Sequence, residues 1–443
     1  MAYGSQKTNT QALTDITGLV HEIFTEKVLP SVRWESVTAQ LFQNASGGDD
    51  YRYDGESLNG ATDLLRPHGA LGTDGALPDS SHQDAGNWQT TPVRRYVRRA
   101  VDNYVESAAV KGPGSFDDLG QRLFDQMWGA WKMMEIRQAV GGSNGYLCST
   151  NTRTSATVVI MDDGLNHVGN DPLLFLDEGM VIAWIDASNS NAVGGAGKIS
   201  SIAYSTNTVT FAASIENGTS TPTLAANDLW VAATTTDPVN SDYFQTEFQN
   251  SKNGLFEIVD PNAAATTVFN ISQTTFPRWK PFREASSTWD HIEVTEHIRK
   301  LRAKSTAPVG PDSHTVVLQG APYAELARTL VGFQQMADLG KKLEGGYETI
   351  RVSGVDFAVD DFQLQNVMYC LCMEDLYTVS LVEAGHFDED GSMYERISDF
   401  DGKEWFVRDY CNSFSPRRNR HGALTGITLS NVTASDFSPT PNY

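Results

Sequence analysis

Residues 51–104 hold two strand-like runs that cannot form a hydrophobic core with each other. The runs, Tyr51–Leu65 and Trp88–Tyr104, flank a loop rich in Gly, Asp, Pro, His and Ser over residues 67–86. A two-stranded ribbon is only marginally stable in water. Its large apolar residues are few and scattered: Leu58, Leu64, Leu65, Leu71, Trp88 and Val97. We therefore predict an extended arm that is ordered by something outside itself. A second copy of the chain is the simplest candidate, so this feature favours assembly over catalysis.

The length and charge of the chain bound what it can do. It has 443 residues, enough for two or three domains with a sizeable core. Its formal charge of −22 disfavours nucleic-acid binding, because affinity for phosphates comes from Lys and Arg. We expect neither a signal peptide nor a membrane-spanning segment, because the first residues are polar and no apolar run is long enough.

The four cysteines do not form a metal or redox motif. Cys370 and Cys372 are two residues apart on one strand-like run, whereas Cys148 and Cys411 are isolated in the sequence. This spacing is neither the CxxC of zinc sites nor that of redox sites. We expect reduced structural thiols, as in a protein that folds in the cytosol.

Two helices are predicted before residue 145. Apolar residues recur at helical spacing over residues 13–29, in a short segment that resembles a docking arm. The strongest helical pattern covers Phe116–Val140, with Ser115 as the N-cap and with Asp117 and Asp118 in the first turn, where the helix dipole favours anions. This helix is ~37 Å long at 1.5 Å per residue.

Residues 155–236 differ from the rest in composition. Thr, Ala, Ser, Asn and Gly dominate, and Lys and Arg nearly vanish. Short strand-like runs recur there: Thr157–Met161, Met180–Asp186, Ile199–Tyr204, Val209–Ala213 and Leu229–Thr234. The pattern predicts a small β-barrel or sandwich inserted into a larger domain.

The remainder of the chain is mixed. Helices are predicted at Trp289–Lys304 and Pro322–Asp338. Strands are predicted at Thr315–Gln319, Thr349–Val359 and Val367–Met373. Four further runs are predicted to form one terminal ladder: Tyr377–Glu383, Met393–Asp399, Glu404–Tyr410 and Gly422–Leu429.

Two motifs resemble enzyme signatures but fail on context. Gly141–Gly145 matches G-x-S-x-G, yet a nucleophile elbow needs a strand before it, and here a long helix precedes Ser143. Gly194–Lys198 resembles part of a P-loop, but Ile199 stands where Ser or Thr is required.

Two candidate metal motifs also fail. His291 and His297 are six residues apart, so on a helix they diverge around the axis and cannot share a metal with Glu293. His386–Gly391 resembles part of an EF-hand, but its first and twelfth positions would be His386 and Ile397, which are wrong for Ca²⁺. We expect no catalytic residue, no cofactor and no bound metal.

Two arginine clusters remain as candidate contact residues. Arg94, Arg95, Arg98 and Arg99 lie on the second run of the arm, and Arg417, Arg418 and Arg420 lie in a later turn. The first cluster is read in three ways: a solvated edge that discourages aggregation, a nucleic-acid contact, or a pairing with carboxylates of a neighbouring subunit. We favour the third. The candidate partners are on the long helix of the adjacent subunit: Asp117, Asp118 and Asp125. For the second cluster, a solvated loop and an inter-subunit contact both stay open.

The order of the segments resembles the major capsid protein of tailed bacteriophages, which has the Hong Kong 97-type fold. The segments that carry the resemblance are the arm 51–104, the helix 115–140, Gly254–Asp260 with Phe276–Lys280, and the closing run from Asp401–Trp405 through Tyr410 to Arg417–Ile427. The resemblance covers nearly the whole chain and lies in the layout rather than in short motifs.

The resemblance implies an α+β fold with six parts. These are an N-terminal arm (1–50), an extended loop (51–112), the spine helix of a peripheral domain (113–154), an inserted β domain (155–236), an axial domain with connecting segments (237–375), and the β-ladder of the peripheral domain with the C-terminus (376–443). Some members of the family cross-link neighbours through a lysine of the extended loop. This chain has no Lys between Lys27 and Lys111, so that chemistry cannot start from its loop.

The resemblance also implies a function without catalysis. Copies of the chain would assemble as hexamers and pentamers into an icosahedral shell around double-stranded DNA, without sequence-specific binding and without a membrane. Scaffolding, portal and decoration proteins would be partners. Assembly would take place in the cytoplasm of a bacterial host, and the product would be a virion capsid. Two alternatives are an encapsulin-like shell that encloses enzymes, and an enzyme with its site on the β insert.

Overall fold

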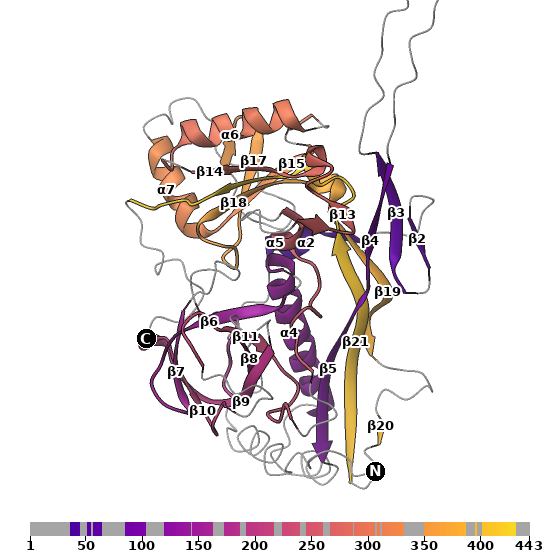
Figure 1. The fold of residues 1–443 in the computed structure, drawn as a ribbon, viewed down its shortest axis with the longest axis vertical. Coiled ribbons are helices and arrows are strands. Elements are labelled where there is room, and N and C mark those ends of the chain that lie inside the picture. Colours follow the sequence, from indigo (N-terminus) through magenta and orange to yellow (C-terminus); the bar gives the residue numbers. More distant parts are fainter. Residues whose placement is uncertain are drawn as a thin grey trace, which may run out of the picture.

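The computed structural model places most of the chain in three bodies and a small arm sheet (Figure 1). The residues that the structure describes are 36–44, 51–54, 56–63, 85–102, 119–142, 144–162, 172–186, 192–216, 224–239, 245–259, 266–286, 288–305, 308–310, 312–331, 350–386, 395–396 and 401–430. The predicted helix over 13–29 lies outside these residues. The mixed helix and sheet content is the predicted α+β class.

The first body is a sheet built around one long strand, which we call the β21 sheet. Its members are β1 (Gln43–Asn44), β5 (Val93–Asp102), β19 (Tyr377–His386), β20 (Glu395–Arg396) and β21 (Gly402–Phe414). β19 and β20 pair with one edge of β21, and β5 pairs antiparallel with the other edge over its whole length. Side chains of β21 such as Val407, Asp409 and Cys411 are buried on one face, where the long helix lies.

That helix, α4 (Leu119–Val140), runs beside β5 and β21 (Figure 1). It ends at Val140, as predicted, because Gly141 and Gly142 follow and the N–H of Gly141 donates to the carbonyl of Arg137. Residues 116–118 of the predicted helix lie outside the described part. A short helix, α2 (Val37–Leu41), contacts α4, with Ser36 as its N-cap.

The second body is a closed barrel of six strands in the order β10-β7-β6-β11-β8-β9. Its strands are β6 (Tyr146–Arg153), β7 (Val158–Asp162), β8 (Val181–Asp186), β9 (Ala192–Ala203), β10 (Thr208–Phe211) and β11 (Leu229–Ala232). Trp184 and Trp230 are fully buried within it. All five predicted runs are strands here. The sixth strand, β6, was assigned to the preceding segment, because its polar Ser, Thr, Asn and Arg residues do not stand out in a sequence pattern. The barrel therefore begins before residue 155.

The third body is a six-stranded sheet, which we call the β18 sheet, in the order β14-β22-β18-β15-β17-β16. Its strands are β14 (Phe282–Ala285), β15 (His314–Leu318), β16 (Ile350–Val352), β17 (Val355–Val359), β18 (Val367–Cys372) and β22 (Gly422–Thr425). Two helices accompany it, α6 (His291–Lys304) and α7 (Gly320–Val331). Apolar residues of α6 and of the sheet share one core. Figure 1 shows the two helices beside the strands of this sheet.

Two predictions for this region are wrong. The run Gly422–Leu429 does not join the terminal ladder: β22 pairs with β14 and β18 instead. A short strand that is buried on both faces carries no periodicity that tells which sheet receives it. Thr349–Val359 is not one strand but a hairpin, in which Ser353 and Gly354 adopt positive φ values of 53° and 76° between β16 and β17.

The arm sheet has three antiparallel strands in the order β2-β3-β4. They are β2 (Tyr51–Tyr53), β3 (Leu58–Asp63) and β4 (Ala85–Thr90). Each predicted run of the arm is therefore divided. The first run turns between Tyr53 and Leu58, and the second run is interrupted at Thr91 and Pro92, after which β5 joins β21 of the same chain. The prediction that the whole second run depends on another molecule is wrong for Val93–Asp102, because β5 forms its ladder hydrogen bonds with β21 of the same chain.

Smaller elements join these bodies. They are α5 (Leu255–Val259), the hairpin of β12 (Thr267–Val268) and β13 (Ile271–Ser272), and 3₁₀ turns at Tyr204–Thr206, Pro277–Trp279, Met373–Asp375 and Arg418–Arg420. One hydrophobic core contains residues of the arm sheet, the β21 sheet, α5 and the β18 sheet, including Leu58, Trp88, Leu255, Val317 and Phe414.

Candidate assembly surfaces

The root of the arm is fixed to its own subunit by Trp88. This side chain is 2% exposed and stacks on Phe414, with the ring centroids 4.4 Å apart. It also covers Gly60 of β3, where a Cβ atom would lie 2.3 Å from the indole ring. Only glycine fits there, since Trp88 occupies the space of any side chain. Leu58 is buried beside the same core.

Hydrogen bonds to neighbouring segments hold β4 at this root. The N–H of Gln89 donates to the carbonyl of Phe269 at 3.0 Å, and the amide of Asn412 donates to the carbonyl of Thr91 at 2.6 Å. Phe269 and Asn270 form the turn of the β12–β13 hairpin with φ values of 47° and 64°. A bulky residue with positive φ is a strained outlier. The hairpin therefore keeps a strained turn at the point where it receives the arm.

The turn between β2 and β3 is stabilised by hydrogen bonds to Asp54. The Asp54 carboxylate accepts hydrogen bonds from the backbone N–H groups of Ser57 and Glu56 and from the side chain of Asn59. The backbone hydrogen bonds of Ser57 and Glu56 lower the pKa of Asp54 to about 2. Asp54 and Glu56 are exposed, so this charge faces solvent, whereas Ser57 is buried.

The Arg cluster of β5 is divided by the alternation of the strand. Arg95 is 4% exposed and points to α4. Its guanidinium donates to both carboxylate oxygens of Asp409 and to Glu135 and Gln138 of α4, and it lies 5.3 Å from the ring of Trp131. Arg95 thus joins β5, β21 and α4 within one subunit, in contrast to the expected contact with a neighbour.

Glu135 is the centre of this buried network. It also accepts from the ammonium of Lys252, which is fully buried and lies 5.5 Å from the ring of Phe42. Burial alone would raise the pKa of Glu135, but the charges of Lys252 and Arg95 lower it to about 2. Two cations and two carboxylates compensate one another here, so the loss of any one leaves a buried charge without its partner.

The other arginines of β5 lie differently. Arg94 and Arg98 are exposed on the opposite face of the strand, and Arg98 pairs with Glu404. Arg99 is partly buried, opposite Trp405 in the ladder. Asp125 is exposed on α4, whereas Asp117 and Asp118 lie outside the described residues. An inter-subunit contact of Arg94, Arg98 or Arg99 stays a prediction.

The second Arg cluster connects the β21 sheet to the β18 sheet. Arg418 is fully buried, donates to the carbonyls of Ile258 and Glu257 in α5, and lies 4.8 Å from the ring of Trp279. Arg418 therefore belongs to the core of the subunit. It lies neither in a solvated loop nor at a contact between subunits, the two alternatives that the sequence left open. Arginine in a turn sequence gives no sign of such burial.

Arg417 and Arg420 connect the two segments of the chain that run between the β18 sheet and the β21 sheet. Arg417 donates to Asp375 at 2.7 Å, and Arg420 lies 3.1 Å from the other oxygen of that buried carboxylate. Asp375 is on the chain that leaves the β18 sheet, and the arginines are on the chain that returns to it. In the structure, both arginines contact Asp375 of the same chain. An inter-subunit contact of these two residues stays a prediction.

Two buried histidines, His421 and His297, are neutral structural groups. His421 accepts from the N–H of Cys372 at Nδ1, so Nε2 carries the proton and donates to Ser415 Oγ at 2.9 Å. Burial, followed by the charges of His314 and Arg418, lowers the pKa of His421 to about 3. Burial likewise lowers the pKa of His297 to about 4, although Glu284 opposes the shift. Both rings are neutral structural groups at neutral pH.

The rejected motifs occupy ordinary structural places. Ser143 lies outside the described residues, between the end of α4 and the start of β6. His297 is buried against Phe282, whereas His291 is half-buried at the start of α6. Within the described ranges, no group of three or more His, Cys, Asp or Glu residues is arranged to hold a metal ion. In the same ranges, none of the helices has the length and apolar character needed to cross a membrane.

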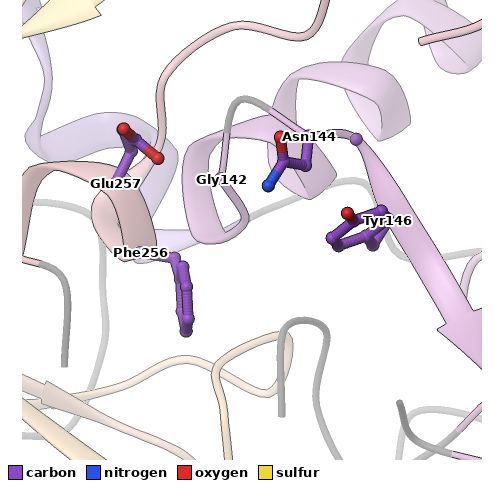
Figure 2. Close-up of a pocket in the computed structure, with 6 residues that line it drawn as sticks. Gly142, Asn144, Tyr146, Phe256 and Glu257 are labelled. Atoms are coloured by element: carbon purple, nitrogen blue, oxygen red, sulfur yellow. The ribbon is translucent and has the colours of Figure 1, made fainter. Parts of the chain in front are cut away.

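A small pocket lies at the end of α4 (Figure 2). It is lined by Gly142, Asn144, Gly145, Tyr146, Phe256 and Glu257. Its volume of about 30 Å³ has room for water but not for a substrate. The pocket therefore does not provide an enzyme site.

The fold is similar to solved capsid structures. No protein-family model matches the sequence, and no curated protein is similar to it. The cyanophage A-1(L) capsid asymmetric unit matches with a TM-score of 0.54 and 13% identity, over 93% of this chain and 98% of that chain. The capsid of an empty GTA particle (TM-score 0.45, 7% identity, 91% and 94% of the chains) and that of cyanophage P-SCSP1u (0.44, 11%, 92% and 92%) are less similar. This chain has the fold of bacteriophage capsid proteins, as the order of its segments predicted.

Proposed function

We propose that this chain is a major capsid protein, and that its copies assemble as hexamers and pentamers into an icosahedral shell around double-stranded DNA. The likeness to the cyanophage A-1(L) capsid asymmetric unit carries this proposal. Because it covers 93% of this chain and 98% of that chain, it extends over the whole subunit rather than over one shared domain.

The arm sheet supports assembly on physical grounds. It is anchored at its root by Leu58 and Trp88, whereas β2 is exposed and Tyr53 presents 43% of its surface to solvent. A three-stranded sheet of short strands has little core of its own. Contacts with neighbouring copies would stabilise the part of the arm beyond its root.

We assign the parts of the chain to domains according to the predicted layout. We assign residues 1–50 to an N-terminal arm, residues 51–112 to an extended loop that begins with the arm sheet, and the barrel to an inserted β domain. The β18 sheet forms most of the axial domain. The peripheral domain consists of α4 and the β21 sheet, to which the N-terminal arm contributes β1 and the extended loop contributes β5.

The proposed partners follow from a shell without catalysis. Scaffolding and portal proteins would guide assembly in a bacterial cytoplasm, decoration proteins would bind the finished virion, and DNA would be enclosed without sequence-specific contacts. Arg94, Arg98 and Arg99 would contact carboxylates of a neighbouring copy, with Asp117, Asp118 and Asp125 as candidates. Chemistry on a substrate is not part of this function.

Sedimentation of the purified chain, alone and with its scaffold, tests the proposal. We expect capsomers or closed particles that sediment far ahead of the monomer. From the natural source, the particles should protect double-stranded DNA from nuclease. A species that stays monomeric or dimeric at high concentration contradicts the proposal, and particles that protect enzymes instead of DNA contradict its second half.

A further inference from the structure

Asparagine followed by glycine can rearrange without an enzyme. The backbone nitrogen of the glycine attacks the side-chain carbonyl carbon of the asparagine, a five-membered succinimide forms, and ammonia leaves. Glycine favours this step because it has no Cβ that would obstruct ring closure. The asparagine side chain must be able to rotate onto the following nitrogen. Four such dipeptides occur in the chain: Asn59–Gly60, Asn144–Gly145, Asn217–Gly218 and Asn253–Gly254.

The structure describes three of these dipeptides, and Asn59 is the first that is held in place. Its amide donates to the Asp54 carboxylate at 2.6 Å and to Ser57 Oγ at 3.2 Å. Gly60 lies in the ladder of β3, between β2 and β4. Both side-chain hydrogen bonds would have to break before the Asn59 side chain could rotate toward the nitrogen of Gly60.

Asn253 is held more firmly. Its amide donates to Thr90 Oγ1 at 3.3 Å and to the carbonyl of Ser413 at 3.2 Å. Gly254 is enclosed by backbone, since an added Cβ atom would lie 2.1 Å from the carbonyl oxygen of Gln138. Neither the side chain nor the following nitrogen is therefore free to move into the geometry of attack.

Asn144 differs from both. It is half-buried in the turn between α4 and β6, and among the described residues its amide has no hydrogen-bond partner. The N–H of Gly145 donates to the carbonyl of Gly142 at 3.2 Å, which closes a β-turn with Asn144 at its third position. No hydrogen bond of the side chain has to break before the amide rotates toward the nitrogen of Gly145.

The small pocket at this turn supplies what the later steps require. Figure 2 shows the amide of Asn144 and the carboxylate of Glu257 on facing sides of the pocket. Its volume of about 30 Å³ has room for a water molecule, and its lining is partly polar. A carboxylate can accept a proton through such a water. Water then opens the succinimide at either of its two carbonyls and gives aspartate or isoaspartate.

We infer that Asn144 is a site of spontaneous modification, at which deamidation through a succinimide places a carboxylate at the junction of α4 and the barrel. The new charge lies beside Glu257 and just beyond the C-terminus of α4, where the helix dipole disfavours anions. The modification does not depend on the proposed shell function, because it needs only the folded subunit and water.

The modification should loosen the attachment of the barrel to α4. An isoaspartate adds a methylene to the backbone directly before Gly145, and Glu247 leaves no room there: an added Cβ atom on Gly145 would lie 2.9 Å from the carbonyl oxygen of Glu247. The carboxylate of Glu247 pairs with Arg137 of α4 at 2.5 and 2.6 Å. A shift of this segment therefore strains an ion pair that joins the helix to the barrel.

Peptide mapping of the aged full chain tests the inference. The folded protein is incubated at mildly alkaline pH in isotopically labelled water and digested, and the peptides are analysed by mass spectrometry. We expect Asn144 to become aspartate and isoaspartate with a labelled oxygen, at least about tenfold faster than Asn59 or Asn253 reacts. Equal rates at the three positions, or a faster reaction at one of the other two, overturn the inference.

The same measurement in guanidinium chloride separates the effect of the structure from that of the sequence. In the unfolded chain all three asparagines lose their surroundings, so the three rates should converge. If Asn144 kept its full advantage in the unfolded chain, the neighbouring residues in the sequence would set its rate, and the assignment to the free amide at the pocket would be wrong.

Three variants test the consequence for the junction. Asn144→Gln closes the larger ring only slowly, so it should remain unmodified and melt as the wild type does. Asn144→Asp carries the charge of the product and should lower the melting temperature of the unassembled subunit by about 2 °C or more. Asn151→Asp is the matched control, because it makes the same change at an exposed position of β6. Equal melting temperatures for the two Asp variants would overturn the proposed effect on the junction.

Discussion

The indole ring of Trp88, on the last strand of the arm, stacks on Phe414 at the end of β21 with 4.4 Å between the ring centroids. This contact joins residues that are far apart in the sequence and places the arm root in the main core of the subunit. The direction in which the arm leaves the subunit is therefore set by the subunit itself.

Removing the anchor should destabilise the subunit. Trp88→Ala leaves a cavity beside Phe414 and should lower the free energy of unfolding by about 3–5 kcal/mol. Tyr53→Ala removes a ring that is 43% exposed on the same small sheet and should cost less than about 1 kcal/mol. Denaturant titration of the two unassembled variants measures both values, and equal losses would mean that Trp88 is not an anchor.

Neighbouring arginines on β5 should differ sharply in their effect. Arg95→Gln leaves the buried Asp409 without its cation and leaves Glu135 with Lys252 alone, so it should cost about 3–5 kcal/mol of unfolding free energy. Arg94→Gln removes a charge from the exposed face and should cost about 1 kcal/mol or less. The comparison controls for strand position, because the two residues are adjacent. If Arg94→Gln also caused a large loss of unfolding free energy in the unassembled subunit, Arg94 rather than Arg95 would be the structural arginine, and the account would be wrong.

The free energy of unfolding should decrease as the pH is lowered from neutral to mildly acidic values. His421 and His297 have pKa values of about 3 and about 4 in the folded chain, below the 6.5 of an ordinary histidine. The unfolded chain therefore binds protons that the folded chain does not, and the unfolding free energy falls as pH drops below 6.5. Each histidine contributes a loss on the order of a few kcal/mol. Glu135, with a pKa of about 2, adds a further loss below its ordinary value of 4.5.

Denaturant midpoints at several pH values between 7 and 4 test this dependence. The His421→Gln variant should be less stable at pH 7, but its stability should depend less on pH over this range. A wild-type midpoint that stays constant from pH 7 to pH 4.5 would contradict the assignment of neutral buried histidines.

The barrel should not tolerate a methyl group at Gly195. A Cβ atom there would lie 1.8 Å from the carbonyl oxygen of Ile215, and backbone cannot yield as a flexible side chain can. Gly195→Ala should cost at least about 1–3 kcal/mol through overpacking. Gly310→Ala is the matched control, since nothing lies within 4 Å of its added Cβ. Calorimetry of both variants tests the packing, and a neutral Gly195→Ala would show that β9 is placed differently.

The sequence predicted local features better than long-range ones. The end of α4 and the five runs of the barrel follow from glycine punctuation and short strand patterns, which act within a few residues. The partner of β5 and the sheet that receives β22 depend on pairings across more than fifty residues, and no local pattern encodes these. The same limit applies to Arg95. The alternation of the strand predicts that Arg95 and Arg94 lie on opposite faces, but it does not predict which face meets α4.

The candidate contact residues show the same division. Arg418 looks like a surface residue in a turn, yet the carbonyls of α5 and the ring of Trp279 surround it. Buried arginine is recognised only when the groups that satisfy its donors are known.

Negative-stain electron microscopy of the purified full-length chain, across a range of protein concentrations and salt, measures whether the fold assembles as proposed. We expect rings of five and six subunits or closed shells, with fewer particles at high salt because ion pairs between exposed charges are screened. A field of uniform monomers or dimers at high concentration, from protein whose arm root is folded, would contradict a shell-forming function.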